Sequence, residues 1–180
     1  MRDLPTRDAF LATVRAALTG PAPRPALRTL LDEMVQALSG WPRPWLEHAG
    51  DELLLASSPE MTVYHITLTP RIHYPPHDHR MAAMIALYQG SETSFSYRRN
   101  GAGLTLLQRH DHAAPGIAEL PADAIHSVVN MGTARSAAIH VYFGDLIAAK
   151  RSIWDRELRQ ERPFDNDFYF EQARAVEDEA

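Results

Sequence analysis

The stretch Tyr74-Pro-Pro-His-Asp-His-Arg-Met-Ala-Ala-Met-Ile-Ala-Leu-Tyr-Gln-Gly90 joins a polar segment to an apolar run that ends at a glycine. Two histidines in it, His77 and His79, are separated by one residue and follow a proline pair. In a β-strand, residues i and i+2 point to the same face, so these two imidazoles would be aimed at one point. Neutral imidazole is the commonest protein ligand for transition metals. If the stretch forms a strand there, it therefore carries two ligands of a metal site.

A second pair with the same spacing, His110-Asp111-His112, occurs further along the chain. The chain has nine histidines, so one such pair is readily produced by chance. This pair lies between Gln108-Arg109 and Ala113-Ala-Pro-Gly116, a context that is typical of a loop. We therefore expect the first pair, and not the second, to bind metal.

Composition limits the kind of protein and the kind of metal site. The 180 residues are 45% hydrophobic and 23% charged, which is enough for one globular domain with a core. The net charge of −5 gives no basic surface for nucleic acid. The chain has no cysteine, which excludes disulfides and thiolate zinc sites. Any metal must therefore be held by His, Asp or Glu.

The distribution of apolar residues gives an expectation for the cellular location. No apolar run is long enough to span a membrane, and residues 1–8 lack the apolar segment of a signal peptide. We expect a cytoplasmic protein with no membrane or nucleic-acid partner. The sequence does not determine the oligomeric state.

The first part of the chain is predicted to be helical. Residues 6–19 repeat apolar side chains at helical spacing, and Thr6 can cap the first turn. A second helix is predicted from about residue 25 to 38, with a leucine and methionine stripe on one side. Both stripes are interpreted as packing surface.

From about residue 50 the pattern changes to short apolar stretches separated by turn residues. Alternation at 62–68 and the turn Asn100-Gly101-Ala-Gly103 favour strands and a hairpin. The expected strands are 52–56, 62–69, 81–88, 93–98, 104–109, 116–120, 126–130 and 137–143. About eight strands with a helical N-terminal segment fit a mainly β fold, a jelly-roll barrel (double-stranded β-helix) of the cupin type.

The predicted organisation is a single domain in three parts. Residues 1–48 form an N-terminal helical cap, residues 49–146 form the barrel, and residues 147–180 form an extension that packs on the barrel. Within this extension we expect Arg151–Trp154 to pack back on the barrel and a last helix at residues 165–175. The acidic end, Glu177–Ala180, is expected to fray.

Three more residues are candidates for the same site. His126 starts a predicted strand, and His140 and Tyr142 share the face of another. The positions where a cupin usually has a metal-binding glutamate hold Ala83 and Met84, and Glu92 lies beyond the glycine turn. A site of three neutral imidazoles leaves a divalent ion its full charge and so favours an anionic ligand.

Together, His77-Asp78-His79, His126 in Ile-His-Ser-Val-Val-Asn, and His140-Val-Tyr142 resemble the cysteine dioxygenase family of cupins. More widely they resemble the thiol dioxygenases that use iron held by three histidines, over roughly residues 60–145. Pro-Pro-His-Asp-His-Arg-Met and Tyr-Arg-Arg are also similar to bacterial proteins described as metal-dependent double-stranded β-helix enzymes. The resemblance implies that His77, His79 and His126 bind Fe(II) and that O2 oxidises a thiol to a sulfinate. It also implies that Tyr142 forms a hydrogen bond in the active site and that His140 orients Tyr142.

The chain departs from that family at several positions. Met84 stands where some members have a cysteine crosslinked to the tyrosine, and Ala138 stands where the family has a serine. The family also uses an arginine upstream of the first strands to hold the substrate carboxylate, but none occurs between Arg43 and Arg71. Substrate-binding candidates from other directions are Arg71, Arg80, Arg98 and Arg99, with Tyr64 also expected to line the pocket.

The leading hypothesis is a non-haem Fe(II) dioxygenase that oxidises a small anionic molecule, most plausibly a thiol, with O2. One alternative keeps the metal site but cleaves a C–C bond of an enolisable substrate. The other is a cupin that binds a small ligand without catalysis. Fold alone does not separate them, because function depends on the site.

Overall fold

The computed structural model describes residues 6–38, 44–47 and 50–176. The chain begins with a helical hairpin, α1 (Arg7–Thr19) and α2 (Pro23–Leu38), followed by a short 3-10 helix, η1 (Pro44–Leu46). The side-chain oxygen of Thr6 accepts a hydrogen bond from the backbone N–H of Ala9 at 3.3 Å, as expected of an N-cap. Both predicted helices are confirmed.

Two antiparallel sheets follow the helices. The first has five strands, and its spatial order is β1 (Glu52–Ser57), β2 (Thr62–Leu68), β9 (Ser136–Tyr142), β4 (Ala83–Gln89) and β7 (Gly116–Leu120). The second has the order β11 (Glu161–Pro163), β10 (Ser152–Trp154), β3 (Ile72–Asp78), β8 (Ile125–Val129), β5 (Ser91–Asn100) and β6 (Gly103–Ala113), with β12 (Arg174–Ala175) also paired to β3. Helix α3 (Asn166–Gln172) precedes β12.

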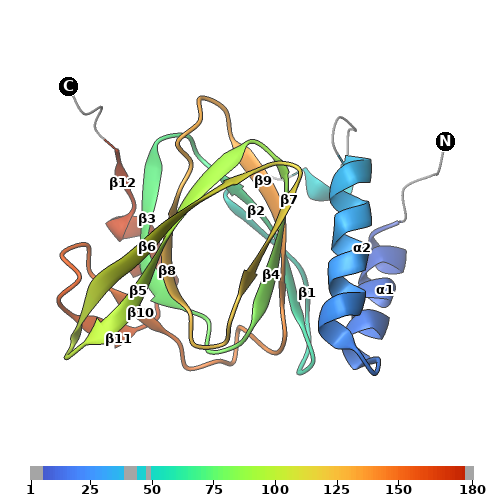
Figure 1. Cartoon of the computed structure of the whole chain (residues 1–180), viewed down its shortest axis with the longest axis horizontal. Helices are drawn as coiled ribbons and strands as arrows, with labels where there is room; N and C mark the ends of the chain where they lie inside the picture. The colour runs from blue at the N-terminus through green and yellow to red at the C-terminus, as the bar shows by residue number, and fades with distance from the viewer. Residues whose placement is uncertain (1–5, 39–43, 48–49, 177–180) are drawn as a thin grey trace.

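Strands that are far apart in sequence are neighbours in both sheets: β4 lies beside β9, and β3 beside β8. This interleaving is the topology of a jelly roll. Figure 1 shows the two sheets facing each other, with the helical hairpin on one flank and the C-terminal segment on the other. The predicted mainly β, cupin-type barrel with a helical N-terminal segment is therefore confirmed.

The largest hydrophobic core lies outside the barrel, between the five-stranded sheet and the helical hairpin. Leu27, Leu31 and Val35 of α2 pack there with residues such as Met84 and Val141. Strand alternation turns the next residues the other way, so Ile85, Leu87, His140 and Tyr142 line the barrel interior. The helices therefore cover the apolar face of this sheet, and the interior is left as a cavity.

All eight predicted strands are present, and Asn100 pairs with Gly103 across the expected hairpin turn. The strand assignment omitted β3, because a Pro-Pro dipeptide reads as a break. In the structure Pro75 and Pro76 lie where the β3–β8 register shifts, between Tyr74 and His77, and a bulge of this kind tolerates residues without an N–H donor.

The segment after residue 147 adds three strands, β10, β11 and β12, to the second sheet. Ile153 of β10 pairs with His77 of β3, and β10 pairs in turn with β11. The division of the domain at residues 48 and 146 stays a prediction, and the fraying expected at 177–180 lies outside the described residues. Among the described residues, no helix is both long and apolar enough to cross a bilayer.

Candidate metal centre and its cavity

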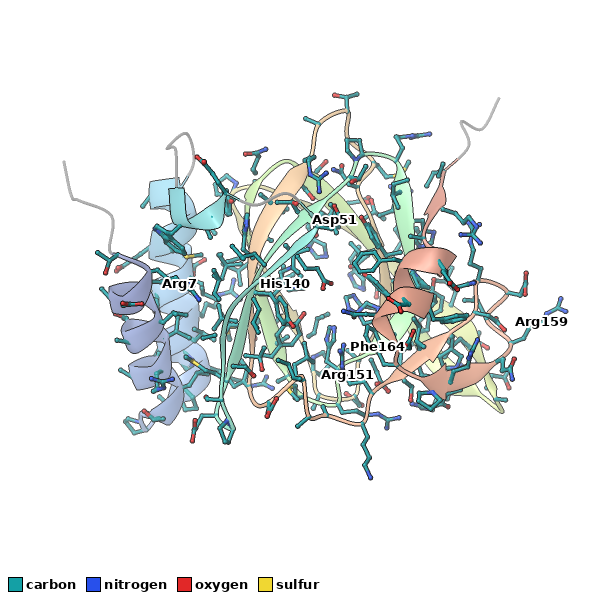
Figure 2. The ribbon with its side chains drawn as sticks, turned by 180° about the vertical axis from the view of Figure 1, so that it is seen from behind. Arg7, Asp51, His140, Arg151, Arg159 and Phe164 are labelled. Atoms are coloured by element: carbon teal, nitrogen blue, oxygen red, sulfur yellow. The ribbon has the colours of Figure 1, made fainter. Side chains whose placement is uncertain are left out.

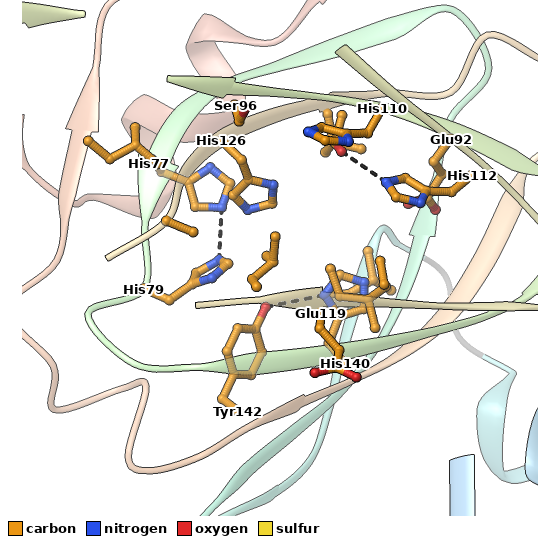
Figure 3. Close-up of a pocket in the computed structure, with 18 of the residues that line it drawn as sticks. His77, His79, Glu92, Ser96, His110, His112, Glu119, His126, His140 and Tyr142 are labelled. Atoms are coloured by element: carbon orange, nitrogen blue, oxygen red, sulfur yellow. Dashed lines mark hydrogen bonds between the residues drawn. The ribbon is translucent and has the colours of Figure 1, made fainter. Parts of the chain in front are cut away.

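Three histidines meet inside the barrel. His77 is opposite His126 in the β3–β8 pairing, and His79 directly follows the end of β3. All three are buried, and one nitrogen from each ring lies within 4.8 Å of the others. Figure 3 shows the three rings pointing toward one another. Among the described residues this is the one group of His, Asp or Glu side chains close enough to share a metal ion.

The residue between the first two histidines fixes their segment. Asp78 is buried, and its carboxylate forms an ion pair with Arg80 Nε at 2.8 Å and accepts hydrogen bonds from Arg99 Nη2 at 3.0 Å and the backbone N–H of Ser152 at 2.8 Å. Charge-assisted bonds of this kind are stronger than neutral ones. The C-terminal segment therefore locks the end of β3, and with it the directions of His77 and His79.

The hydrogen bonds of the rings leave nitrogens free for a metal. His77 Nδ1 lies 3.0 Å from the carbonyl oxygen of Pro75, so Nδ1 carries the proton and Nε2 carries a lone pair. His77 Nε2 is 3.1 Å from His79 Nε2. Among the described residues, His79 Nδ1 and His126 Nε2 are buried and have no hydrogen-bond partner. Buried polar atoms without partners cost about 1–3 kcal/mol each.

A shared cation accounts for the close approach of the two Nε2 atoms and for the unpartnered Nε2 of His126. Two imidazole nitrogens bound at about 2.1 Å to one ion, at near right angles, are about 3.0 Å apart, which agrees with the 3.1 Å separation of the Nε2 atoms of His77 and His79. The triad therefore fits a divalent transition metal held by imidazoles, a ligand set that suits iron, zinc, copper and nickel. No carboxylate joins it, since Met84 packs in the outer core and Glu92 is not part of the cluster.

The electrostatics of the triad favour neutral rings. Burial, reinforced by the neighbouring imidazoles, lowers the pKa of His77 and His79 well below the usual range. Burial also lowers the pKa of His126 to about 4. Desolvation disfavours the charged form of any base, so all three rings keep lone pairs at neutral pH.

The triad opens onto a cavity of about 810 Å³ between the two sheets. Ile66, Leu68, Ile85 and Leu87 supply much of its apolar wall. Polar groups enter from the remaining strands and from the C-terminal segment. A volume of this size accommodates a small organic molecule rather than only an ion and water.

His140 and Tyr142 lie beside the triad, as their shared strand face predicts. His140 Nδ1 is 3.2 Å from the Tyr142 hydroxyl, and the Tyr142 ring centroid is 4.8 Å from that of His79. Burial raises the pKa of Tyr142 and lowers that of His140 to about 3, so the phenol stays protonated and the imidazole neutral. His140 Nε2 is buried with no partner among the described residues, and Ala138, two residues earlier, has no hydroxyl to offer it.

An arginine that the sequence analysis did not select also lines the cavity. Arg151 immediately precedes β10, and its guanidinium carbon is 3.7 Å from the Phe164 ring centroid. Figure 2 shows Arg151 and Phe164 on the side of the C-terminal segment, away from α1 and α2. No carboxylate among the described residues lies within 4 Å of Arg151, and burial lowers its pKa without removing its charge at neutral pH.

The selected arginines lie elsewhere. Arg80 binds Asp78 and Ser152, and Arg98 is exposed, so neither lines the cavity. The bulge between Ser96 and Tyr97 shifts the alternation of β5, which turns Tyr97 inward and Arg98 outward. Tyr64 does line the cavity, and its ring meets that of Tyr142 edge-on with centroids 6.4 Å apart.

The second histidine pair is not in a loop. His110 and His112 lie within β6 and line the cavity, although neither belongs to the triad. The flanking residues, Gln108-Arg109 and Ala113-Ala-Pro-Gly116, predict a loop for this polar run, and that prediction is wrong. Such a strand is nevertheless stable here, since its outer face meets solvent and its inner face meets a polar part of the cavity.

No protein-family model matches the sequence, and no curated protein matches it. Similar solved structures include an RmlC-like cupin family protein with a double-stranded β-helix fold from Methanocaldococcus jannaschii, at 14% identity and a TM-score of 0.45, over 59% of this chain and 88% of that one. They also include a mutant oxalate decarboxylase from Bacillus subtilis, at 14% identity and a TM-score of 0.45, over 54% of this chain and 27% of that one. The match thus spans about a quarter of the decarboxylase chain. The assignment of a cupin-type barrel rests on the strand order described above.

Proposed function

We propose that the chain is an iron-dependent dioxygenase that oxidises a small thiol bearing a carboxylate to the corresponding sulfinate. In this reaction R–SH and O2 give R–SO2H, so sulfur is oxidised, both oxygen atoms are transferred to it, and O2 is fully reduced. The observation that carries the proposal is the buried triad of His77, His79 and His126, which has no carboxylate of its own, facing the same cavity as Arg151. Iron bound there would supply a charged centre for the thiolate and for O2.

The side chains around the triad have distinct roles in this proposal. Arg151 binds the substrate carboxylate, because a desolvated guanidinium favours an anion where no carboxylate among the described residues lies within 4 Å; Glu52 and Asp78 act on it only from further away. Tyr142, kept protonated by burial, donates a hydrogen bond toward the reacting atoms, and His140 holds its hydroxyl. Ile85 and Leu87 exclude water from one side of the cavity.

The first test is the metal content of protein purified without a histidine tag. We expect about one equivalent of iron, retained after anaerobic Fe(II) addition and desalting. His126→Ala should lose it, because two imidazoles hold a divalent ion much more weakly than three. His110→Ala is the matched control, since His110 lines the same cavity outside the triad. Stoichiometric iron in His126→Ala would contradict the ligand assignment.

The second test is oxygen consumption by the iron-loaded protein with 3-mercaptopropanoate, cysteine and the neutral thiol propane-1-thiol. Arg151→Gln should raise KM for the two carboxylates by about 10- to 100-fold, which corresponds to the 1.5–3 kcal/mol of a hydrogen bond to a charged group. The effect on propane-1-thiol should be small, and Arg98→Gln should change neither. An equal rise in KM for all three thiols would show that Arg151 does not bind the substrate carboxylate.

The alternatives remain outcomes of the same assay. The lack of the family's usual arginine upstream of the first strands favours C–C cleavage of an enolisable substrate. Arg151 weakens this argument, because it supplies an arginine to the cavity from another segment. Uptake of O2 with enolisable diketones but not with thiols would favour cleavage. Iron binding without turnover of either class would favour a ligand-binding protein.

A further inference from the structure

A second polar surface lines the cavity away from the triad, on the inner face of β5 and β6. Glu92, Ser94 and Ser96 alternate along β5, while His112 and His110 stand opposite Glu92 and Ser94 on β6. Ser94 Oγ lies 3.1 Å from His112 Nε2. Figure 3 shows Glu92, His110 and His112 grouped apart from the three rings of the triad. We call these five residues the β5–β6 polar face.

Glu92 is the unusual member of this face. Its side chain is buried, and one carboxylate oxygen accepts a 2.7 Å hydrogen bond from the Ser136 hydroxyl. Among the described residues, no Lys or Arg lies within 4 Å of it. A desolvated carboxylate without a cation is costly. Because Glu92 borders a cavity, a ligand rather than the protein can supply that cation.

The β5–β6 polar face extends away from the metal end. Ser96 pairs with His126, and Glu92 lies four residues further along β5, about 13 Å at 3.3 Å per residue. Arg151 lies in the opposite direction, because Ile153 pairs with His77 and Ser152 donates to Asp78, which places Arg151 level with His79. The cavity therefore has a cation on one side of the triad and an acid on the other.

We propose that the β5–β6 polar face is a subsite for the primary ammonium group of the ligand, with Glu92 as its counter-ion. The substrate would then be an extended molecule with an anionic thiol end at the triad and an amine-bearing tail along β5. The anionic end rests on the function proposed above, whereas the ammonium subsite does not. Ser94 and His112 provide further hydrogen-bond partners beside Glu92.

The subsite is tested first on metal-free protein, with hexylammonium as the probe and hexan-1-ol as its neutral counterpart, by calorimetric titration. Wild-type protein should bind hexylammonium at least ten times more tightly than hexan-1-ol. Glu92→Gln should lose that preference and leave hexan-1-ol binding unchanged. Glu119→Gln is the matched control, since Glu119 also lines the cavity but is paired with Arg28 at 2.7 Å.

Equal affinity for the two probes in wild-type protein, or an undiminished preference in Glu92→Gln, would overturn the subsite. A turnover assay then links the two proposals. The iron-loaded enzyme should show a KM at least ten times lower for a thiol carboxylate with a six-carbon amine tail than for its methyl-ended analogue. Glu92→Gln should abolish this difference in KM. Oxidation of short thiols without a tail effect would retain the dioxygenase and reject the subsite. Hexylammonium binding without any thiol oxidation would retain the subsite and reject the dioxygenase.

Discussion

Burial decides the charge of the residues that line the cavity. It lowers the pKa of His126 to about 4 and that of His140 to about 3, because a desolvated imidazolium is unfavourable. Both rings are therefore neutral near pH 7. The same desolvation raises the pKa of Glu92. One physical effect thus prepares histidines as ligands and makes the ionised form of Glu92 costly.

Glu92 gives a prediction about stability against pH. In the unfolded chain it titrates near its ordinary pKa of 4.5, and in the folded protein the pKa is raised. Below 4.5 both states are protonated and burial carries no electrostatic cost. As pH rises from 4.5 through the raised pKa, the unfolded chain ionises more readily and the folded protein loses stability. Above the raised pKa the loss is complete.

Glu92→Gln removes this titration and keeps an acceptor for Ser136. We therefore expect the variant to be more stable than wild-type protein at pH 7.5, by about 1.4 kcal/mol for each unit that separates the two pKa values. The difference should shrink on acidification and vanish near pH 4. Urea unfolding at several pH values measures it, and a difference that does not depend on pH would show that Glu92 is not a strained carboxylate.

Single residues differed in how far their role could be predicted from the sequence. His77, His79, His140 and Tyr142 form i, i+2 pairs, a spacing that itself defines a shared strand face. Arg151 has no such signal, because it stands alone in a polar segment and its direction depends on stacking over Phe164. A lone side chain whose position is set by a distant contact leaves no local pattern to read.

At the scale of elements, two strands carry the same motif with different consequences. In β3 the central residue, Asp78, is buried and binds Arg80, Arg99 and the backbone of Ser152. In β6 the central residue, Asp111, is exposed and binds Arg109 and Thr93. The two strands thus provide a matched pair of aspartates, each flanked by histidines.

Asp78→Ala should lower the free energy of unfolding by about 3 kcal/mol, because it leaves a buried N–H without an acceptor and removes the buried carboxylate that pairs with Arg80 and Arg99. It should also weaken iron binding at least tenfold, since the end of β3 directs His77 and His79. Asp111→Ala should change stability by less than about 1 kcal/mol and leave iron binding intact. Denaturant titration and metal competition measure both, and equal effects of the two variants would reject the locking role of Asp78.

The strands that the sequence misassigned share a physical cause. Propensity rules count Pro75 and Pro76 against a strand, but the bulge in β3 needs no N–H donor there. The polar run around His110 lacks the apolar alternation of a half-buried strand, yet β6 extends to Ala113 because the interior it faces is itself polar. In both cases the tertiary environment, which a local pattern does not contain, overrides the local preference.

At the scale of the whole molecule, the main core and the candidate metal centre lie on opposite sides of the five-stranded sheet. The outer core joins α1 and α2 to the five-stranded sheet, whereas the triad lies in the barrel interior on strands of the other sheet. The fold class could be predicted because the number and spacing of the strands reflect this layered arrangement. The cavity could not, because its shape depends on which strands become neighbours.

This separation predicts that metal binding and packing in the outer core contribute to stability additively. Anaerobic Fe(II) at about one hundred times its Kd should add about 2.7 kcal/mol to the free energy of unfolding, which raises Tm by about 5 to 10 °C for a chain of this length. His126→Ala should remove that increment, because the triad is lost. Leu31→Ala should instead lower Tm with and without metal. It opens a cavity in the outer core, which lowers the free energy of unfolding by about 2 to 5 kcal/mol.

Leu31 is fully buried in the outer core and shares no contact surface with the triad, so the two effects should add. Thermal unfolding of wild-type protein, Leu31→Ala and His126→Ala, each with iron and with a chelator, gives the comparison. The same iron-dependent rise in wild-type protein and Leu31→Ala is the expected result. A rise that disappears in Leu31→Ala would mean that the helical hairpin positions the metal site through the five-stranded sheet, and the two faces of that sheet would then form one cooperative unit.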